Sequence, residues 1–132
     1  MTRHRKSLRR IIRDDRGVAA VEMAFAFPIL MIMLWMIIQL GLVFRAVSGM
    51  QHALGEGARY ATIYPRPTDT QITQRIQDKV YGSGPGTFTV SSPVSGTGFV
   101  TLQVSYSQPT SLLFLPGPTV SLTRSKKVWI AD

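Results

Sequence analysis

Few side chains in this sequence could act as acids, bases or metal ligands. The chain has two histidines, His4 and His52, and no cysteine. Neither histidine has a second ligand at a metal-binding spacing. The acidic residues outside the N-terminal region are scattered: Glu56, Asp69, Asp78 and Asp132. No glycine-rich phosphate loop follows a predicted strand, and no serine lies in a nucleophile elbow. The sequence therefore favours a protein that is not an enzyme and that needs no cofactor or metal.

One carboxylate, Glu22, stands at the start of a long uncharged run. From Met23 to Phe44 the chain has no charged residue and a single amide, Gln39. As a helix this run would be about 33 Å long, enough to cross the hydrocarbon layer of a membrane. An ionised carboxylate costs about 2.5–3.5 kcal/mol at the centre of such a helix and less at the interface. Glu22 therefore either reaches the headgroups as an interfacial charge or has a partner that offsets this cost.

The cations are concentrated before this run. Residues 1–17 hold seven of them against Asp14 and Asp15, a net charge of +5 out of the +8 of the whole chain. The seven are Arg3, Arg5, Lys6, Arg9, Arg10, Arg13 and Arg16. Short segments rich in Lys and Arg stay on the cytoplasmic side, so we expect residues 1–17 inside and residues 46–132 outside the cytoplasm. No aromatic residues interleave with these cations, and no nucleic-acid-binding motif follows, so we expect no nucleic acid partner.

A secretory signal peptide is the competing interpretation of the apolar run, with Ala46, Val47 and Ser48 as a small-residue cleavage site. The apolar region of a signal peptide is only about 7–15 residues long. The run from Met23 to Phe44 is longer and favours a permanent membrane span, which we place at residues 18–45.

Two short stretches of this sequence resemble a known family. Residues 16–22 read RGVAAVE and resemble the prepilin processing site, in which a peptidase cuts after a glycine and a glutamate follows at the fifth position. Here the glycine is Gly17, the new first residue would be Val18, and the glutamate is Glu22. In detail the sequence is similar to the TadE-like pseudopilins of tight-adherence (Tad, Flp) pilus systems. Their helix later carries a Glu-Gly-Ala-Arg-like stretch, which occurs here as Glu56, Gly57, Ala58 and Arg59.

The resemblance implies a minor pilin or pseudopilin that acts in pilus assembly, adhesion or secretion. Its implied partners are a prepilin peptidase, other pilins and pseudopilins, and an assembly platform in the bacterial inner membrane. Glycine has no side chain to obstruct the peptidase and little commitment to helix, which suits Gly17 to the cut. The new ammonium of Val18 could pair with Glu22 of a neighbouring subunit, because pairing compensates two buried charges at once.

Two other functions stay open on the sequence alone. One is an unprocessed single-span accessory protein that binds a partner through its extracytoplasmic domain. The other is a pseudopilin of a type II secretion system, for which calcium-site acids in the soluble domain would be a sign, and these are not seen here. Whether residues 1–17 are removed separates the first of these functions from the pilin.

A single long helix is expected to position these stretches. Pro28 lies inside the helical pattern and predicts a kink or local unwinding near residues 24–28. Beyond the span, apolar and small residues recur at a spacing of three to four residues and predict an amphipathic stalk that ends near residue 62, before Pro65. The residues of this stripe are Val43, Val47, Met50, Ala53, Leu54, Gly57, Ala58 and Ala61. Gly55 and Gly57 could mark a close contact with the sheet or another subunit, or could simply be tolerated.

The remaining residues predict a small α+β domain. Thr68 and Asp69 would cap a short helix in which Ile72, Ile76 and Val80 share one face. Three antiparallel strands follow at Thr87–Pro93, Phe99–Ser107 and Thr119–Ile130, and they are expected to pack on the long helix. The domain organisation is thus a basic cytoplasmic leader at 1–17, a membrane helix at 18–45 and an extracytoplasmic α+β domain at 46–132.

Two features of the predicted sheet have no assigned role. A loop from Pro109 to Pro118 carries four large apolar residues, Leu112–Leu115, which either cover the open edge of the sheet or contact another subunit. The last strand carries a small basic cluster, which is typical of a solvated edge that discourages strand addition. These cations are Arg124, Lys126 and Lys127.

Overall fold

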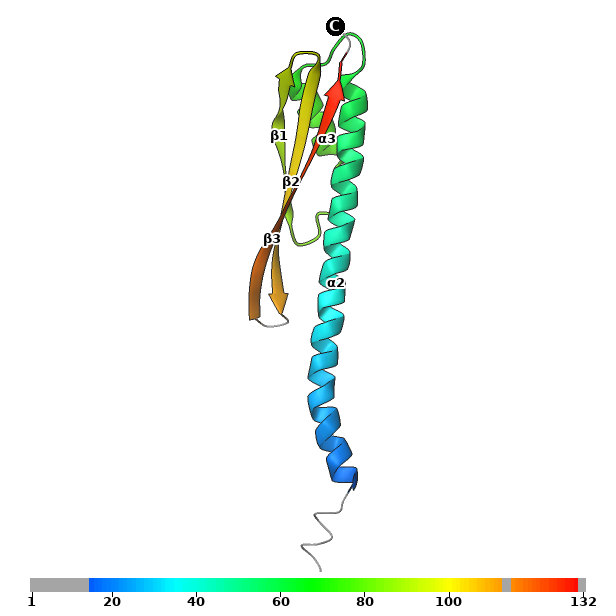
Figure 1. The fold of residues 1–132 in the computed structure, drawn as a ribbon, viewed down its shortest axis with the longest axis vertical. Coiled ribbons are helices and arrows are strands. Elements are labelled where there is room, and N and C mark those ends of the chain that lie inside the picture. Colours follow the sequence, from blue (N-terminus) through cyan, green and yellow to red (C-terminus); the bar gives the residue numbers. More distant parts are fainter. Residues whose placement is uncertain (1–14, 113–114, 131–132) are drawn as a thin grey trace, which may run out of the picture. The chain divides into compact units, whose positions relative to one another are not determined.

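The computed structural model describes residues 15–112 and 115–130. Its elements are two helices, α2 (Asp15–Ala61) and α3 (Asp69–Lys79), and three strands, β1 (Thr87–Gly96), β2 (Phe99–Leu112) and β3 (Leu115–Trp129). The predicted α+β fold is confirmed, with its long apolar helix, short second helix and three-stranded antiparallel sheet (Figure 1). Residues 1–14 of the predicted leader lie outside the described residues.

The chain divides into two compact units, residues 1–36 and 37–132, and the boundary falls inside α2. In the first unit the helix includes Pro28, and the local distortion expected there stays a prediction. Helix α2 contains an apolar window long enough to cross a membrane, of which only 6% is buried inside the protein. An apolar surface left this bare needs lipid or other protein chains to cover it.

The second unit has its core between the end of α2, α3 and one face of the sheet. Helix α2 contributes a stripe of small and apolar residues, and α3 contributes Ile72 and Ile76. The buried hydrophobic residues of α2 are Ala46, Met50, Ala53, Leu54, Ala58 and Ala61. Most of the predicted stripe is therefore confirmed, whereas Val43 and Val47 are only half-buried. Helix α2 ends at Ala61, close to the predicted position.

Strand β2 is the centre of the sheet, whose order is β1-β2-β3 with both pairs antiparallel. Its inward side chains alternate along the strand and are almost completely buried: Val100, Leu102, Val104 and Tyr106. This alternation is the pattern from which the strand was predicted. Full burial of such side chains contributes roughly 1.5–3 kcal/mol each relative to leaving them exposed.

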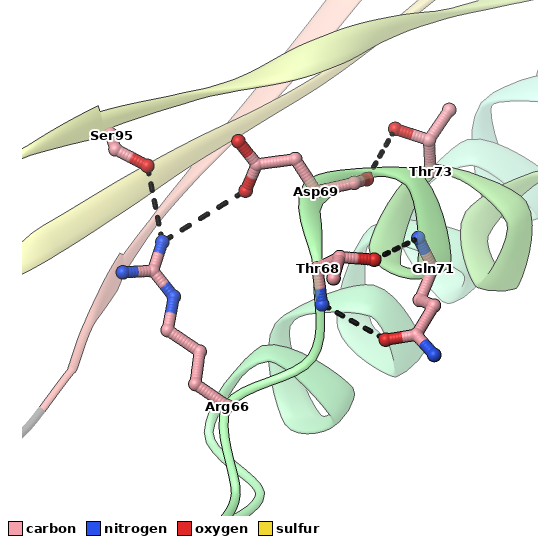
Figure 2. A network of polar contacts seen from close by, with 6 residues as sticks. All are labelled: Arg66, Thr68, Asp69, Gln71, Thr73 and Ser95. Atoms are coloured by element: carbon pink, nitrogen blue, oxygen red, sulfur yellow. Dashed lines mark hydrogen bonds and ion pairs between the residues drawn. The ribbon is translucent and has the colours of Figure 1, made fainter.

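Helix α3 begins with the predicted cap. Thr68 accepts a hydrogen bond from the backbone N of Gln71 at 3.3 Å, and Gln71 Oε1 accepts one from the backbone N of Thr68 at 2.9 Å (Figure 2). This reciprocal pair is a capping box, which satisfies two backbone donors at the start of the helix. Arg66 reaches from the preceding turn to Asp69, at 3.9 Å, and donates to the Ser95 hydroxyl at 3.1 Å. The start of α3 is thereby tied to the end of β1.

The prediction that residues Pro109 to Pro118 form a loop is wrong. Strands β2 and β3 stay paired through this segment, down to Leu112 opposite Leu115, with an irregularity between Pro109 and Ser111. Strand β1 pairs with β2 only as far as Ser107, so the last part of β2 and the first part of β3 form a two-stranded ribbon beyond β1 (Figure 1). Proline is tolerated on an edge strand because its missing N–H interrupts no ladder on the open side. Of the apolar residues 112–115, Leu113 and Phe114 lie outside the described residues.

Candidate assembly segment along helix α2

The residues of the resembled cleavage site lie in the first two turns of α2. Gly17 is helical, and a Cβ built at this position would meet no atom within 4 Å. The described part of the chain therefore gives no packing reason for a glycine here. Val18, the next residue, is exposed. Glycine is among the weakest helix formers, so the first turn of the helix is easily unwound around the Gly17–Val18 bond.

Glu22 is exposed one turn after Val18. Among the described residues no ion pair or hydrogen bond to its carboxylate is found. Its surroundings on α2 are apolar and exposed, and they include Val21 and Met23. A carboxylate on such a surface becomes costly once lipid or protein covers the surface, unless a cation arrives with the cover.

The second resembled stretch has a structural role inside the second unit. Glu56 Oε2 lies 3.7 Å from Arg75 Nη2 on α3, and the Arg75 guanidinium stacks over the Tyr60 ring at 5.9 Å. The Glu56 side chain is more than half covered. Partial burial makes this ion pair stronger than a fully solvated one, since water screens it less. Glu56 thus links the stalk part of α2 to α3.

Gly57 and Ala58 lie where the helix meets its neighbours most closely. A Cβ at Gly57 would lie 2.4 Å from Cγ1 and 2.8 Å from Cδ1 of Ile76, and 3.5 Å from Leu102. Only a residue without a side chain lets α3 and the sheet approach α2 to this distance. Ala58, next in the chain, is buried. These two residues set the packing distance between α2, α3 and β2.

Arg59 differs from its three neighbours because it is exposed. It lies in the last turn of α2, where a cation interacts favourably with the helix dipole. Its carbonyl accepts hydrogen bonds from the backbone N of Thr62 at 3.3 Å and from the Thr62 hydroxyl at 2.8 Å, which close the end of the helix. Each residue of the stretch from Glu56 to Arg59 thus has its own role. Glu56 contacts α3 and Gly57 allows close packing. Ala58 is a core residue and Arg59 lies in the last turn of the helix.

Two further residues of α2 make contacts that the sequence did not reveal. Gly49 faces the backbone of Tyr81, since a Cβ there would lie 1.9 Å from the Tyr81 carbonyl oxygen. Gln39 is buried, and its amide pairs with both backbone groups of Ser111: Nε2 donates to the carbonyl oxygen, and Oε1 accepts from the backbone N at 3.4 Å. As the lone amide of the apolar run, Gln39 was visible in the sequence, but its partner 72 positions away was not.

The described residues hold little that could support catalysis. They contain no group of three His, Cys, Asp or Glu side chains that could hold a metal ion. His52 packs its ring against Tyr81, with 5.6 Å between the ring centroids. An open pocket of about 300 Å³ is lined by Gln77, Val80, Phe88 and Val90, none of which is an acid, a base or a strong nucleophile.

Helix α2 is apolar and long enough to span a bilayer, and together with the small α+β unit joined to it this suggests a membrane-anchored protein. Residues 17–59 match the family model of the TadE-like protein. The match begins at Gly17 and ends at Arg59, so it contains residues 17–22 of the first stretch and the whole of the second, and it supports the resemblance to TadE-like proteins of Tad pilus systems. No curated protein and no solved structure matches the chain. Residues 60–132, which form α3 and the sheet, lie outside the matched segment.

Proposed function

We propose that this chain is a minor pilin or pseudopilin of a Tad-type pilus, cut after Gly17 by a prepilin peptidase. The observation that carries the proposal is the start of the family match at Gly17, on a bare apolar helix that presents Glu22 five residues later. Minor pilins of this class are structural subunits, so the proposed role is structural and not enzymatic.

Assembly depends on cleavage through charge. The uncut chain carries seven cationic side chains in residues 1–17, and each would cost several kcal/mol to bury in the apolar interior of a filament. The precursor therefore stays in the inner membrane with its N-terminus in the cytoplasm. Removal of residues 1–17 leaves one ammonium at Val18, which pairs with Glu22 of a neighbouring subunit. This pairing selects the axial position of the incoming subunit, because any other position leaves both charges unpaired.

The partners follow from these steps. The peptidase acts on residues 16–18 at the membrane surface. Other pilins and pseudopilins cover the apolar face of α2, and an assembly platform in the inner membrane moves the subunit out of the bilayer. Residues 46–132 lie outside the cytoplasm, where the α+β unit is available to the other components of the pilus.

Intact-mass spectrometry of the membrane-extracted protein tests the proposal. In cells with an active prepilin peptidase the protein should lack residues 1–17 and begin at Val18, and in cells without the peptidase it should keep them. Gly17→Val should block the cut, because a β-branched residue restricts the extended backbone that a peptidase binds, whereas Gly17→Ala is the milder control. A wild-type chain that keeps residues 1–17 beside an active peptidase would exclude the pilin function and leave an anchored accessory protein.

A further inference from the structure

The ribbon formed by β2 and β3 beyond the end of β1 has an open edge. Past Ser107, strand β2 has no strand neighbour on the β1 side. An open edge leaves backbone N–H and C=O groups without partners. At Ser111 both groups are satisfied by the side-chain amide of Gln39, which has the same donor and acceptor as a peptide bond. Gln39 thus takes the place that β1 would occupy as the third strand at this position.

This contact places the ribbon beside the apolar run. Gln39 lies within the uncharged run that ends at Phe44, six residues before Arg45, the first charge after it. Six residues of helix are about 9 Å long. If α2 crosses a bilayer with Arg45 at its outer surface, Ser111 lies below that surface, at the depth of the upper acyl chains. The ribbon continues from Ser111 toward Leu112 and Leu115.

The composition of the ribbon suits an apolar environment. No charged residue occurs from Val80 to Thr123. Three residues of the ribbon are prolines, which bring no backbone N–H that would need a partner: Pro109, Pro116 and Pro118. The Thr110 hydroxyl donates to the carbonyl of Pro118, and this internal bond satisfies another polar group. Leu115 is 67% exposed in the protein alone, so its apolar surface has no cover within the described residues.

We propose that the end of the ribbon, residues 110–112 and 115–118, lies in the outer leaflet of the lipid bilayer, held against α2 by the amide of Gln39. In lipid each backbone polar group needs an internal partner. Here the pairing of β2 with β3 and the Gln39 amide supply such partners, while the prolines bring no N–H that would need one. The amide of Gln39, itself costly in an apolar run, is satisfied by the same contact. The inference rests on membrane anchoring by α2 and requires neither cleavage after Gly17 nor incorporation into a pilus.

The absence of cysteine from the chain allows a direct test. Leu115→Cys places a single thiol on the ribbon, and Val94→Cys places one on β1 at nearly the same exposure, 66% against 67%. Each full-length variant is labelled with an environment-sensitive fluorophore and reconstituted into phosphatidylcholine vesicles that carry quencher groups on their acyl chains. We expect the label at residue 115 to shift to the blue and to be quenched several-fold more than the label at residue 94.

Gln39→Met tests the role of the amide. Methionine is similar to glutamine in length, but it is apolar and cannot form the two hydrogen bonds to the backbone of Ser111. In the Leu115→Cys background this change should reduce lipid quenching toward the level of residue 94. Equal quenching at residues 115 and 94 in protein that floats with the vesicles would overturn the inference while leaving the anchor intact. A signal at residue 115 that depends on protein concentration and not on lipid quenchers would overturn it in favour of contact with a second copy. Protein that does not float with the vesicles would overturn both the anchor and the inference.

Discussion

Gly55 and Gly57 lie two residues apart in α2, and their surroundings differ. A Cβ at Gly55 would meet no atom within 4 Å, whereas a Cβ at Gly57 would overlap the side chain of Ile76. Ile76 is fully buried, so the core behind it resists any shift. The glycine at 57 is required by packing, and the one at 55 is tolerated.

This difference predicts opposite effects of the same substitution. Gly55→Ala should raise the stability of the full-length protein in detergent by up to about 1 kcal/mol, the gain in helix propensity. Gly57→Ala should lower it, because overpacking of a core costs about 1–3 kcal/mol and outweighs that gain. Thermal unfolding followed by circular dichroism would show the order Gly55→Ala, wild type, Gly57→Ala. Equal midpoints for the two variants would contradict the close contact with Ile76.

Tyr106 is the described residue whose ionisation should affect stability. Its Oη lies 2.8 Å from the Ser83 carbonyl oxygen and 2.7 Å from Gln108 Oε1, and its ring packs on Phe88 with 4.8 Å between centroids. Burial raises the pKa of Tyr106 above its usual value of 10.0, and contact with the Gly86 backbone acts in the opposite direction with a smaller effect. The fold therefore favours the neutral phenol.

The sign of the pH dependence follows from this direction. Because the pKa in the folded protein is above that in the unfolded chain, the contribution is complete below about pH 10 and is lost as the pH rises through the folded pKa. Denaturant midpoints of the wild type should fall above about pH 10 by more than those of Tyr106→Phe. The phenylalanine variant should start lower at neutral pH, since Gln108 and Ser83 lose their hydroxyl partner. Parallel curves for the two proteins would exclude ionisation of Tyr106 as the cause.

At the scale of single elements, α3 depends on its N-terminal cap. The helix has only 11 residues, a length at which an isolated helix is marginal, so its end contacts matter. Thr68 and Gln71 close the capping box, and the Arg66 contacts with Asp69 and Ser95 fix the approach to β1.

Thr68→Ala should destabilise the protein by about 1 kcal/mol, because the backbone N–H of Gln71 loses its acceptor. Thr70→Ala is the matched control, since Thr70 is exposed in the first turn of the same helix. Amide hydrogen exchange in α3, measured together with the unfolding midpoint, should rise in the first variant and stay unchanged in the second. An unchanged exchange rate in Thr68→Ala would mean that α3 is held by its buried face alone.

The elements also show which parts of the fold were open to prediction from the sequence. Helix α3 and the core of β2 have strong local patterns, a cap followed by isoleucines at four-residue steps and an alternation of buried residues, and both were predicted. The ribbon was missed because three prolines in ten residues are normally read as a loop. Its contact with Gln39 is 72 positions away in sequence and leaves no local signal.

At the scale of the whole molecule, the two halves of α2 have different tasks. The half before residue 37 has exposed apolar side chains and carries Gly17 and Glu22. The half after it packs against the rest of the second unit through Gly49, Gly57 and the small residues between them. The sequence predicted the long apolar helix of the first half from composition alone, since a helix long enough to span a bilayer requires only a run of about 20 apolar side chains. It predicted the packed stripe approximately, but the roles of Gly49 and Glu56 depend on partners from α3 and the segment before β1.

Glu22→Ala separates maturation from assembly. The variant should be cut like the wild type, since residue 22 lies beyond the scissile bond and the change makes the helix more apolar. It should then be depleted from sheared filament fractions, because the Val18 ammonium of a neighbour has no carboxylate to pair with. Intact mass and recovery in the filament fraction are measured on the same cells. Normal recovery of the cut variant would show that Glu22 is an interfacial charge without a role in register.

The uncharged segment from Val80 to Thr123 has a practical consequence for how the protein can be digested. Trypsin cuts after lysine and arginine, and neither residue occurs between Lys79 and Arg124. A complete tryptic digest therefore releases β1, β2 and the start of β3 as one long peptide, Val80–Arg124, whether the chain was folded or not. Shorter fragments from this region in cell extracts would be the work of another protease, and they would report its access to the sheet directly.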